Sequence, residues 1–197
     1  MKNANFWKRF TAYMIDIFLL WTALFIVELI IPRSDLYFET DRALTLISEN
    51  FVIGKISLTT FLNGYADLIR IADKEQIFLS LANVIFIMIY FCAMPYFFDG
   101  QTFGKKIMGV KIARKDKECL TLKSLLIRNI IINGLGSLLT SLVCIFILPG
   151  KLYFAVTSIF GIIQILLVII SGFMVLYRKD KRGLQDIFSG TKVVLDK

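Results

Sequence analysis

An acidic side chain stands inside a long apolar stretch near the start of the sequence. Asp16 follows Arg9 by seven residues, and the residues from 10 to 31 are mostly apolar. A carboxylate inside a membrane costs about 2.5 to 3.5 kcal/mol unless it is protonated, paired or hydrated. Because Arg9 would lie ~10 Å away along a helix axis, we expect Asp16 to find its partner on another helix.

The residue types that most enzyme chemistry needs are missing or scattered. The chain has no histidine, which excludes a Ser-His-Asp triad, a histidine proton shuttle and most catalytic zinc sites. The three cysteines, Cys92, Cys119 and Cys144, follow neither a metal-site nor a disulfide spacing. We therefore expect a protein that is not an enzyme and has no metal and no cofactor. Any proton chemistry must use carboxylates.

The composition is that of a membrane protein. Of the 197 residues, 57% are hydrophobic and only 19% are charged, and the mean hydropathy is +0.71. A membrane crossing needs about 20 mostly apolar residues, and four stretches qualify: 10–31, 76–98, 126–148 and 152–177. The sequence therefore predicts an all-α integral membrane protein, with a four-helix transmembrane bundle in a single domain over residues 1–197.

The basic residues predict the orientation of these spans. Of the 23 Lys and Arg residues, 17 lie in the N-terminal tail, the segment 99–128 and the C-terminal tail 178–197. Cytoplasmic loops of membrane proteins carry an excess of Lys and Arg, so both termini and the loop 99–125 are predicted to be cytoplasmic. The net charge of +8 is then a topology signal, with some attraction to anionic lipids, and nucleic acid is not an expected partner.

The predicted extracytoplasmic loop, 32–75, is too long for a simple turn. Apolar residues recur at helical spacing between Leu58 and Ala72, which predicts an amphipathic helix in this loop.

The central loop and the C-terminal tail carry a short internal repeat. At an offset of 81 residues, Asp180 matches Asp99, Gly190 matches Gly109, and Lys192 matches Lys111. Apolar and polar residues alternate as in a strand. A parallel repeat of two helical hairpins would pair 110–113 with 191–195 as a small cytoplasmic β-sheet.

Polar residues in and beside the spans form three predicted groups. A charge cluster at the cytoplasmic ends of the spans contains Arg9, Asp16, Asp99, Arg128 and Asp186. A ladder of polar side chains across the membrane contains Asn133, Thr140, Gln164 and Asn83. Contacts with lipid head groups are predicted for Lys105, Lys106 and Lys111. The ladder is open to three interpretations: an ion or proton path, polar contacts that pack helices together, and a lipid or ligand pocket.

Three separated segments resemble motifs of the RDD family of bacterial membrane proteins, which is named for one arginine and two aspartates. They are FWKRFTAYMID at 6–16, GQTFGKK at 100–106, and GLQD at 183–186 followed by GTKVV at 190–194. Carried over, the family arginine is Arg9 and the first aspartate is Asp16. The second aspartate is Asp186, with Asp99 as the other candidate. The resemblance implies a multi-pass protein of the bacterial cytoplasmic (inner) membrane.

Two functions remain open on the sequence. Some RDD members have been linked to sodium-proton exchange, and the resemblance would make this chain a secondary transporter or cation/proton exchanger that uses Asp16. The alternative is a non-catalytic scaffold or accessory subunit, whose basic loop and tail bind anionic lipid or a partner protein. A transporter with four spans would have to form a homo-oligomer, whereas a scaffold would be expected to bind a membrane partner protein or lipid.

Overall fold

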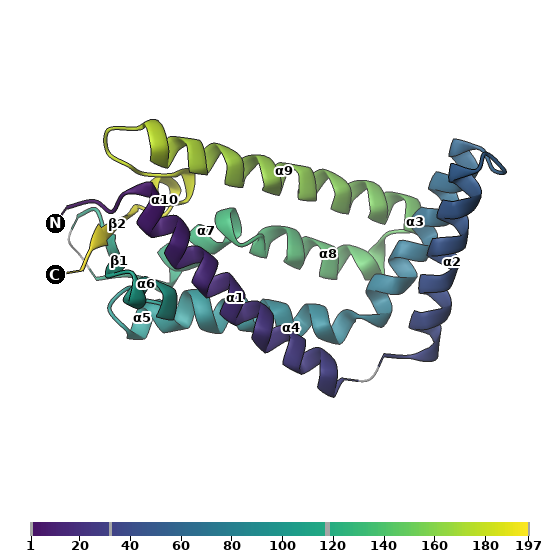
Figure 1. Cartoon of the computed structure of the whole chain (residues 1–197), viewed down its shortest axis with the longest axis horizontal. Coiled ribbons are helices and arrows are strands. Elements are labelled where there is room, and N and C mark those ends of the chain that lie inside the picture. Colours follow the sequence, from purple (N-terminus) through teal and green to yellow (C-terminus); the bar gives the residue numbers. More distant parts are fainter. Residues whose placement is uncertain (1, 32, 117–118, 197) are drawn as a thin grey trace.

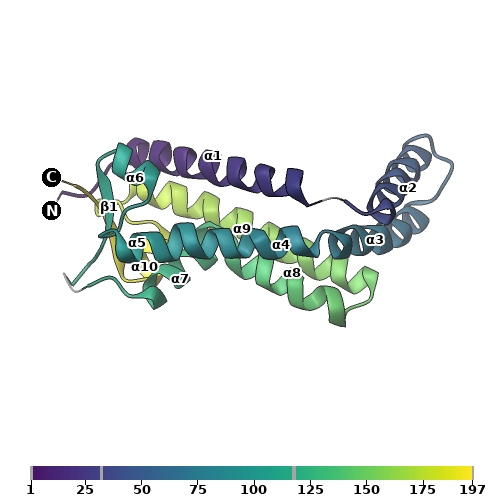
Figure 2. The same cartoon turned by 90° about the horizontal axis from the view of Figure 1, so that it is seen from below.

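Long helices run along the length of the molecule (Figure 1; Figure 2). This computed structural model describes residues 2–31, 33–116 and 119–196. Residues 32 and 197, at the edges of the predicted loop and tail, lie outside the described part. The elements in order are α1 (Phe6–Ile30), α2 (Asp35–Val52), α3 (Leu58–Glu75), α4 (Ile77–Ile87), the π-helical segment η1 (Met88–Ala93), α5 (Met94–Phe97), α6 (Phe103–Ile107), β1 (Val110–Arg114), α7 (Leu122–Ile132), α8 (Leu135–Ile147), α9 (Gly150–Tyr177), α10 (Leu184–Phe188) and β2 (Thr191–Leu195).

Within the described residues, three helices are long and apolar enough to cross a membrane. They are α1, the helix Ile77–Phe97 that joins α4, η1 and α5, and α9. They confirm the predicted spans 10–31, 76–98 and 152–177 to within a few residues. Large apolar side chains are exposed along all three, including Phe18, Phe78 and Ile165. Such extended apolar surface is typical of a face that contacts lipid, so the fold is an all-α membrane bundle.

The predicted span over 126–148 is not a continuous helix but is broken into α7 and α8. The axes of α7 and α8 differ by 78°, so this pair is a fourth span only if it crosses as a bent unit. Gly134 lies at the bend with a φ of +67°, a left-handed conformation that favours glycine. Gln164 of α9 donates from Nε2 to the carbonyl oxygen of Ile131 at 2.8 Å. A side chain from the neighbouring helix thus satisfies a carbonyl group that the bend leaves without its helical partner.

The predicted loop 32–75 contains two helices instead of one. The helix α3 confirms the predicted amphipathic helix, whereas α2 was not predicted. The hydroxyls of Ser34 and Ser57 cap the two helices by accepting hydrogen bonds from backbone N–H groups. The helix α2 packs against α3, and α3 packs against α9. Together α2 and α3 close one end of the molecule (Figure 1), which we call the hairpin end.

The opposite end holds the short elements and both chain termini (Figure 1). The strands β1 and β2 pair antiparallel with Ile112 opposite Val193, which confirms the predicted small sheet. Cys92 and Leu125 pack in a buried cluster with apolar residues of both strands. Ala4 donates its backbone N–H to the carbonyl oxygen of Val193 at 3.0 Å. We call this end, formed by residues 2–5, α5, α6, β1, α10 and β2, the sheet end.

The internal repeat has a structural counterpart at the sheet end. The short helices α6 and α10 each follow a long helix, and each is followed by a strand. Gly109 and Gly190, which are 81 residues apart, both adopt a positive φ, of 61° and 67°, just before these strands. The opposed pair Ile112 and Val193 has the same separation. The two halves therefore share the order of long helix, short helix, glycine and strand, and α2 and α3 are an insertion in the first half.

Docking of the hairpin end on α9 yields a testable prediction. Gly150 is the first residue of α9, and a Cβ at this position would collide with both the side chain and the backbone of Asp67 in α3. We expect Gly150→Ala to lower the free energy of unfolding by about 1 to 3 kcal/mol, measured by thermal unfolding in detergent. Gly161→Ala is the matched control, because a Cβ there meets open space. Equal destabilisation by both substitutions would contradict the docking of α3 on α9.

Candidate functional site

Two fully buried aspartates lie where the long helices meet the sheet end. Asp16 comes from α1 and Asp186 from α10, and both have an exposed fraction of 0%. Each accepts several hydrogen bonds from other parts of the chain. These two carboxylates organise the candidate site.

Asp16 binds the first turn of α6 to α1. Its Oδ1 accepts hydrogen bonds from the Tyr90 hydroxyl and from the backbone N–H of Gly104, both at 2.7 Å. Its Oδ2 accepts from the Thr102 hydroxyl at 2.6 Å, and Lys105 Nζ lies 3.5 Å away. As expected, the partners of Asp16 come from outside α1: they are donors from η1 and from residues 102–105, not Arg9.

The close approach of α6 to α1 explains the glycine at position 104. A Cβ on Gly104 would collide with the carbonyl oxygen of Ala12 and with the Asp16 carboxylate. Thr102 caps the same helix, since its Oγ1 accepts from the backbone N–H of Lys105. The Thr-x-Gly-Lys part of the central motif is thus a carboxylate-binding turn in this chain.

Asp186 joins two arginines. Its Oδ2 accepts from Arg9 Nη1 at 2.7 Å, and its Oδ1 accepts from Arg128 Nη1. Burial alone would raise the pKa of Asp186, but the guanidinium groups of Arg128 and Arg9 outweigh burial and lower this pKa below its usual value. Arg9 also donates from Nε to the carbonyl oxygen of Ala4 and from Nη2 to that of Val193. Arg9 therefore connects α1, the N-terminal residues, α10 and β2.

The structure brings together four of the five residues of the predicted charge cluster. Arg9, Arg128 and Asp186 form one ionic group, and Asp16 forms a second group with Lys105. Asp99 does not join them. Its side chain is 85% exposed and accepts from Lys111 Nζ at 2.5 Å, because the chain turns towards solvent after α5. Of the two candidates for the second family aspartate, Asp186 is the one that pairs with the family arginine.

Lys105 lacks the exposure expected for a head-group contact at the surface of the loop. Its side chain is only 13% exposed, and Nζ donates to Thr102 Oγ1 at 3.1 Å beside Asp16. Burial lowers the pKa of Lys105 to about 8, against the opposing effect of the Asp16 charge. Lys106 is exposed, whereas Lys111 forms ion pairs with Asp99 and Asp196.

The predicted polar ladder consists of local contacts in the structure. Asn133 accepts from the Tyr13 hydroxyl at 3.1 Å and donates to Asn129, while Thr140 donates to the carbonyl oxygen of Gly136 in its own helix. Gln164 binds the bend between α7 and α8, as described above. Asn83 lines a groove near Gln164. The bonds of Asn133 to Tyr13 and of Gln164 to Ile131 join different helices, as polar contacts do in membrane bundles.

Sequence reasoning missed the donors that surround Asp16. Tyr90 lies in the π-helical segment η1, and such a wide turn has no clear sequence signature. Thr102 and Lys105 stand inside the motif that carried the resemblance, so their types and spacing were available. Within the described residues, no group of three or more His, Cys, Asp or Glu side chains is placed to hold a metal ion.

The fold and the site define a helical membrane protein in which buried charged residues join the helices and strands at one end of the bundle. A family model described as the RDD family matches residues 3–190, and the chain belongs to that family. It is similar to the "Uncharacterized protein YckC" of Bacillus subtilis (strain 168), with 28% identity over 120 residues, which is 61% of each chain. The match thus spans about three-fifths of that relative. No solved structure matches the chain.

The shared carboxylate of Asp186 gives a second prediction. Removing one partner of a buried ion pair leaves an uncompensated charge and costs about 3 to 5 kcal/mol, so Asp186→Asn should lower the free energy of unfolding by this order. The control is Asp180→Asn, because Asp180 and Arg178 form an exposed pair worth about 0 to 1 kcal/mol. Chemical unfolding in detergent measures both. An Asp186→Asn protein as stable as Asp180→Asn would contradict the role of this carboxylate.

A third prediction concerns the turn held by Asp16. In Asp16→Asn the side-chain amide has one oxygen that accepts hydrogen bonds, where the carboxylate has two. Residues 102–107 should therefore detach from α1 more often. Trypsin should then cut after Lys105 or Lys106 several-fold faster, as mass spectrometry of the fragments would show. Asp99→Asn is the control, since Asp99 is exposed. Unchanged cleavage in Asp16→Asn would mean that Asp16 does not hold this turn.

Proposed function

We propose that this RDD-family protein is a non-enzymatic membrane scaffold whose sheet end lies at the cytoplasmic face of the bacterial inner membrane and gathers anionic lipid. The contrast between the buried and the exposed charged residues carries the proposal. The buried aspartates Asp16 and Asp186 are fully engaged by internal donors, while many lysines of the sheet end face outward. The first fact points to a structural use of the motif residues, and the second gives the protein a surface for acidic ligands.

Ion exchange through Asp16 would conflict with its surroundings. An exchanging carboxylate must be reached by water or by the ion in at least one state. Asp16 has an exposed fraction of 0%, and both of its oxygens accept hydrogen bonds from the protein. Each turnover would have to break the contacts that hold α6 to α1. The geometry of Asp16 fits a carboxylate that holds α6 against α1 better than it fits an ion-binding site.

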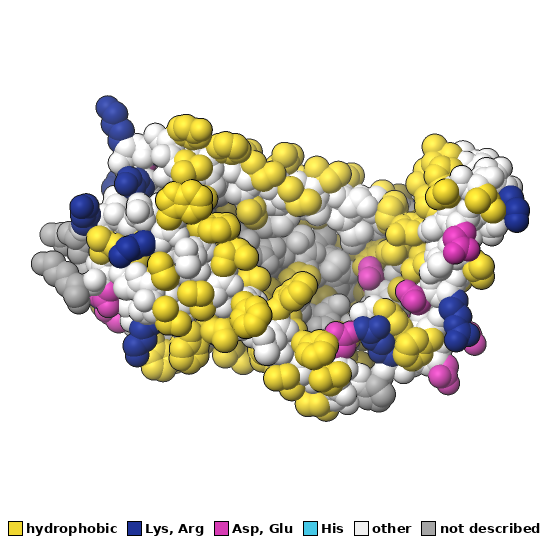
Figure 3. Space-filling view, viewed as in Figure 1, with side chains coloured by type: hydrophobic (Ala, Val, Ile, Leu, Met, Phe, Trp, Pro, Cys, Tyr) yellow, Lys and Arg dark blue, Asp and Glu magenta, His cyan; other side chains and the backbone are white. Residues whose placement is uncertain are grey.

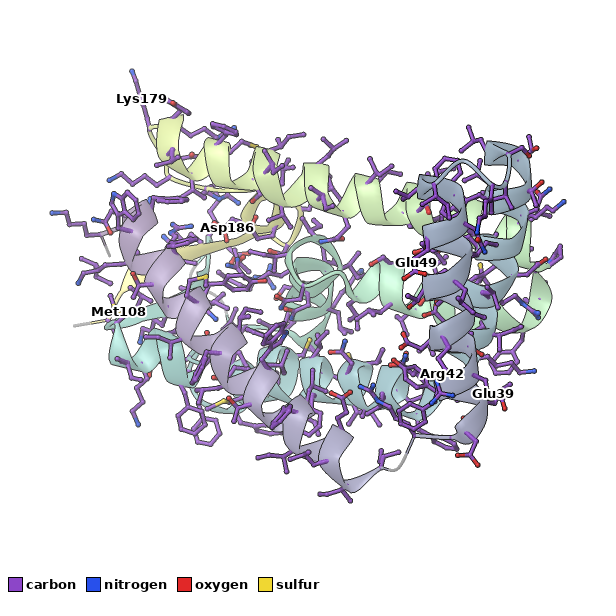
Figure 4. The ribbon with its side chains drawn as sticks, turned by 45° about the vertical axis from the view of Figure 1, so that its right-hand side comes forward. Glu39, Arg42, Glu49, Met108, Lys179 and Asp186 are labelled. Atoms are coloured by element: carbon purple, nitrogen blue, oxygen red, sulfur yellow. The ribbon has the colours of Figure 1, made fainter. Side chains whose placement is uncertain are left out.

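The sheet end is strongly basic on its surface. Lys and Arg side chains gather around it in Figure 3, whereas Asp and Glu side chains are frequent on the hairpin end. Lys179 projects outward from the end of α9, and Glu39 and Glu49 mark the opposite end (Figure 4). The exposed lysines of the sheet end and its flanking segments are Lys2, Lys8, Lys106, Lys115, Lys123, Lys179 and Lys181. Each is worth about 1 kcal/mol of attraction near an anionic membrane surface.

Trp7 offers a built-in reporter of the lipid around this end. It is 68% exposed and precedes Lys8 in α1. In a Trp21→Phe background, we expect brominated phosphatidylglycerol to quench Trp7 more strongly than brominated phosphatidylcholine, because the lysines enrich the anionic lipid. Exchanging Lys8, Lys179 and Lys181 for Gln should remove most of this preference.

The matched control exchanges Lys55, Lys74 and Lys151 for Gln, since these exposed lysines belong to the hairpin end or lie beside it. The proposal fails if both triple variants, or neither, lose the lipid preference.

A flux measurement separates this proposal from exchange. Proteoliposomes with the purified protein should show no proton-coupled sodium flux above empty vesicles. A flux that disappears in a folded Asp16→Asn protein would establish the exchanger instead. The expected homo-oligomer or membrane partner stays a prediction.

A further inference from the structure

A cavity of about 190 Å³ lies between the long helices at the sheet end. Its charged lining residues within the described chain are all cationic: Arg9 of α1, Lys105 of α6 and Arg128 of α7. Asp16 and Asp186 lie behind these cations and do not line the cavity. Uncharged polar side chains also line it: Tyr13, Asn129, Asn133, Ser171 and Gln185. The first four already donate hydrogen bonds within the protein, so the cations are what an anion would meet. This lining is complementary to an anion.

The cavity continues into an apolar groove of about 430 Å³ towards the middle of the bundle. Tyr13, Phe91 and Val168 line both spaces. The groove is bordered by α1 and α9, and the surface is hollowed between these helices (Figure 3). Further along, its walls are mostly apolar, with Leu20 and Ile165 from the two helices. A pocket with three cations in its wall thus opens into a hydrocarbon-like channel at the lipid-facing side of the bundle.

The length of this path matches one leaflet of a membrane. Arg9 lines its polar end, and Leu24 is the last residue of α1 that lines its apolar part. Leu24 follows Arg9 by fifteen positions, or about 22 Å, and half of a bilayer with its head groups is ~20 to 22 Å thick.

We propose that the groove between α1 and α9 binds one anionic phospholipid, with its phosphate at Arg9, Lys105 and Arg128 and an acyl chain along the apolar part. This site lies inside the bundle, separate from the exposed lysines of the sheet end, so the two proposals stand or fall independently.

The charges around the cavity favour a bound anion. Arg9, Arg128 and Lys105 carry three positive charges against the two carboxylates of Asp186 and Asp16. Arg128 uses Nη1 for both Asp186 and Thr191, and within the described residues its other two guanidinium nitrogens have no hydrogen-bond acceptor. Guanidinium groups suit phosphate oxygens because they present several N–H donors in a fixed plane. A phosphate would supply the missing negative charge and acceptors.

Gly172 allows a steric test of this site. It lines the cavity from α9, and a Cβ there meets nothing within 4 Å. Native mass spectrometry of the detergent-purified chain, titrated with dioleoyl phosphatidylglycerol, should show one tightly retained lipid. Gly172→Phe should weaken its retention by about tenfold or more, because the ring fills the polar cavity. Gly161→Phe is the matched control on α9, since position 161 is equally open but does not line the groove.

A charge test uses the same titration. Lys105→Gln should weaken phosphatidylglycerol retention several-fold, whereas Lys115→Gln, which changes an exposed lysine after β1, should not. Dioleoyl phosphatidylcholine should bind more weakly, and inorganic phosphate should not displace the lipid at equal concentration.

Three results would overturn the proposal. They are equal retention by the two glycine variants when both elute as folded protein, equal retention of the two lipids, and full displacement by inorganic phosphate. Because the Gly172 variant leaves every charged residue in place, its result does not depend on the stability of the ionic groups.

Discussion

Two arginines that share one buried carboxylate hold the sheet end of this molecule together. Arg9 lies in the first turn of a membrane-spanning helix, Arg128 lies in α7, and Asp186 lies in a short helix near the end of the chain. Neither arginine can be buried at this depth without a counter-charge. Their pairing therefore requires the chain to return to the N-terminal end of α1, and the sheet forms where it does so.

Asp16 does the corresponding task in the first half of the chain. It holds α6 against α1, and Arg128 holds α10 against α7. The two contacts use opposite charges, but they join equivalent elements of the internal repeat. In both halves a charged group on the first helix fixes the short helix before the strand, and the two strands then pair with each other. The RDD arginine and aspartates of this chain thus connect the elements of the sheet end.

Much of this arrangement follows from local sequence signals. Apolar length predicted the three long helices, and the alternation in the echoed segments predicted the strand pair. The bend at Gly134 was missed because a run of apolar residues continues on both sides of it, although the glycine itself is visible. The helix α2 was not predicted, although apolar residues recur on its inward face at helical spacing: Tyr37, Leu44, Ile47 and Phe51. The pairing of Asp186 with Arg9 depends on a contact across 177 positions, which no local pattern specifies.

A double-mutant cycle on Arg9 and Asp186 tests the structural role of the motif most directly. The free energies of unfolding of Arg9→Gln, Asp186→Asn and the double variant would be compared in one detergent. Since the two side chains are in direct contact at 2.7 Å, their coupling energy should reach about 1 to 3 kcal/mol. The double variant should then be clearly more stable than the sum of the single losses implies. Strictly additive losses would contradict a buried ion pair as the interaction on which this end of the protein depends.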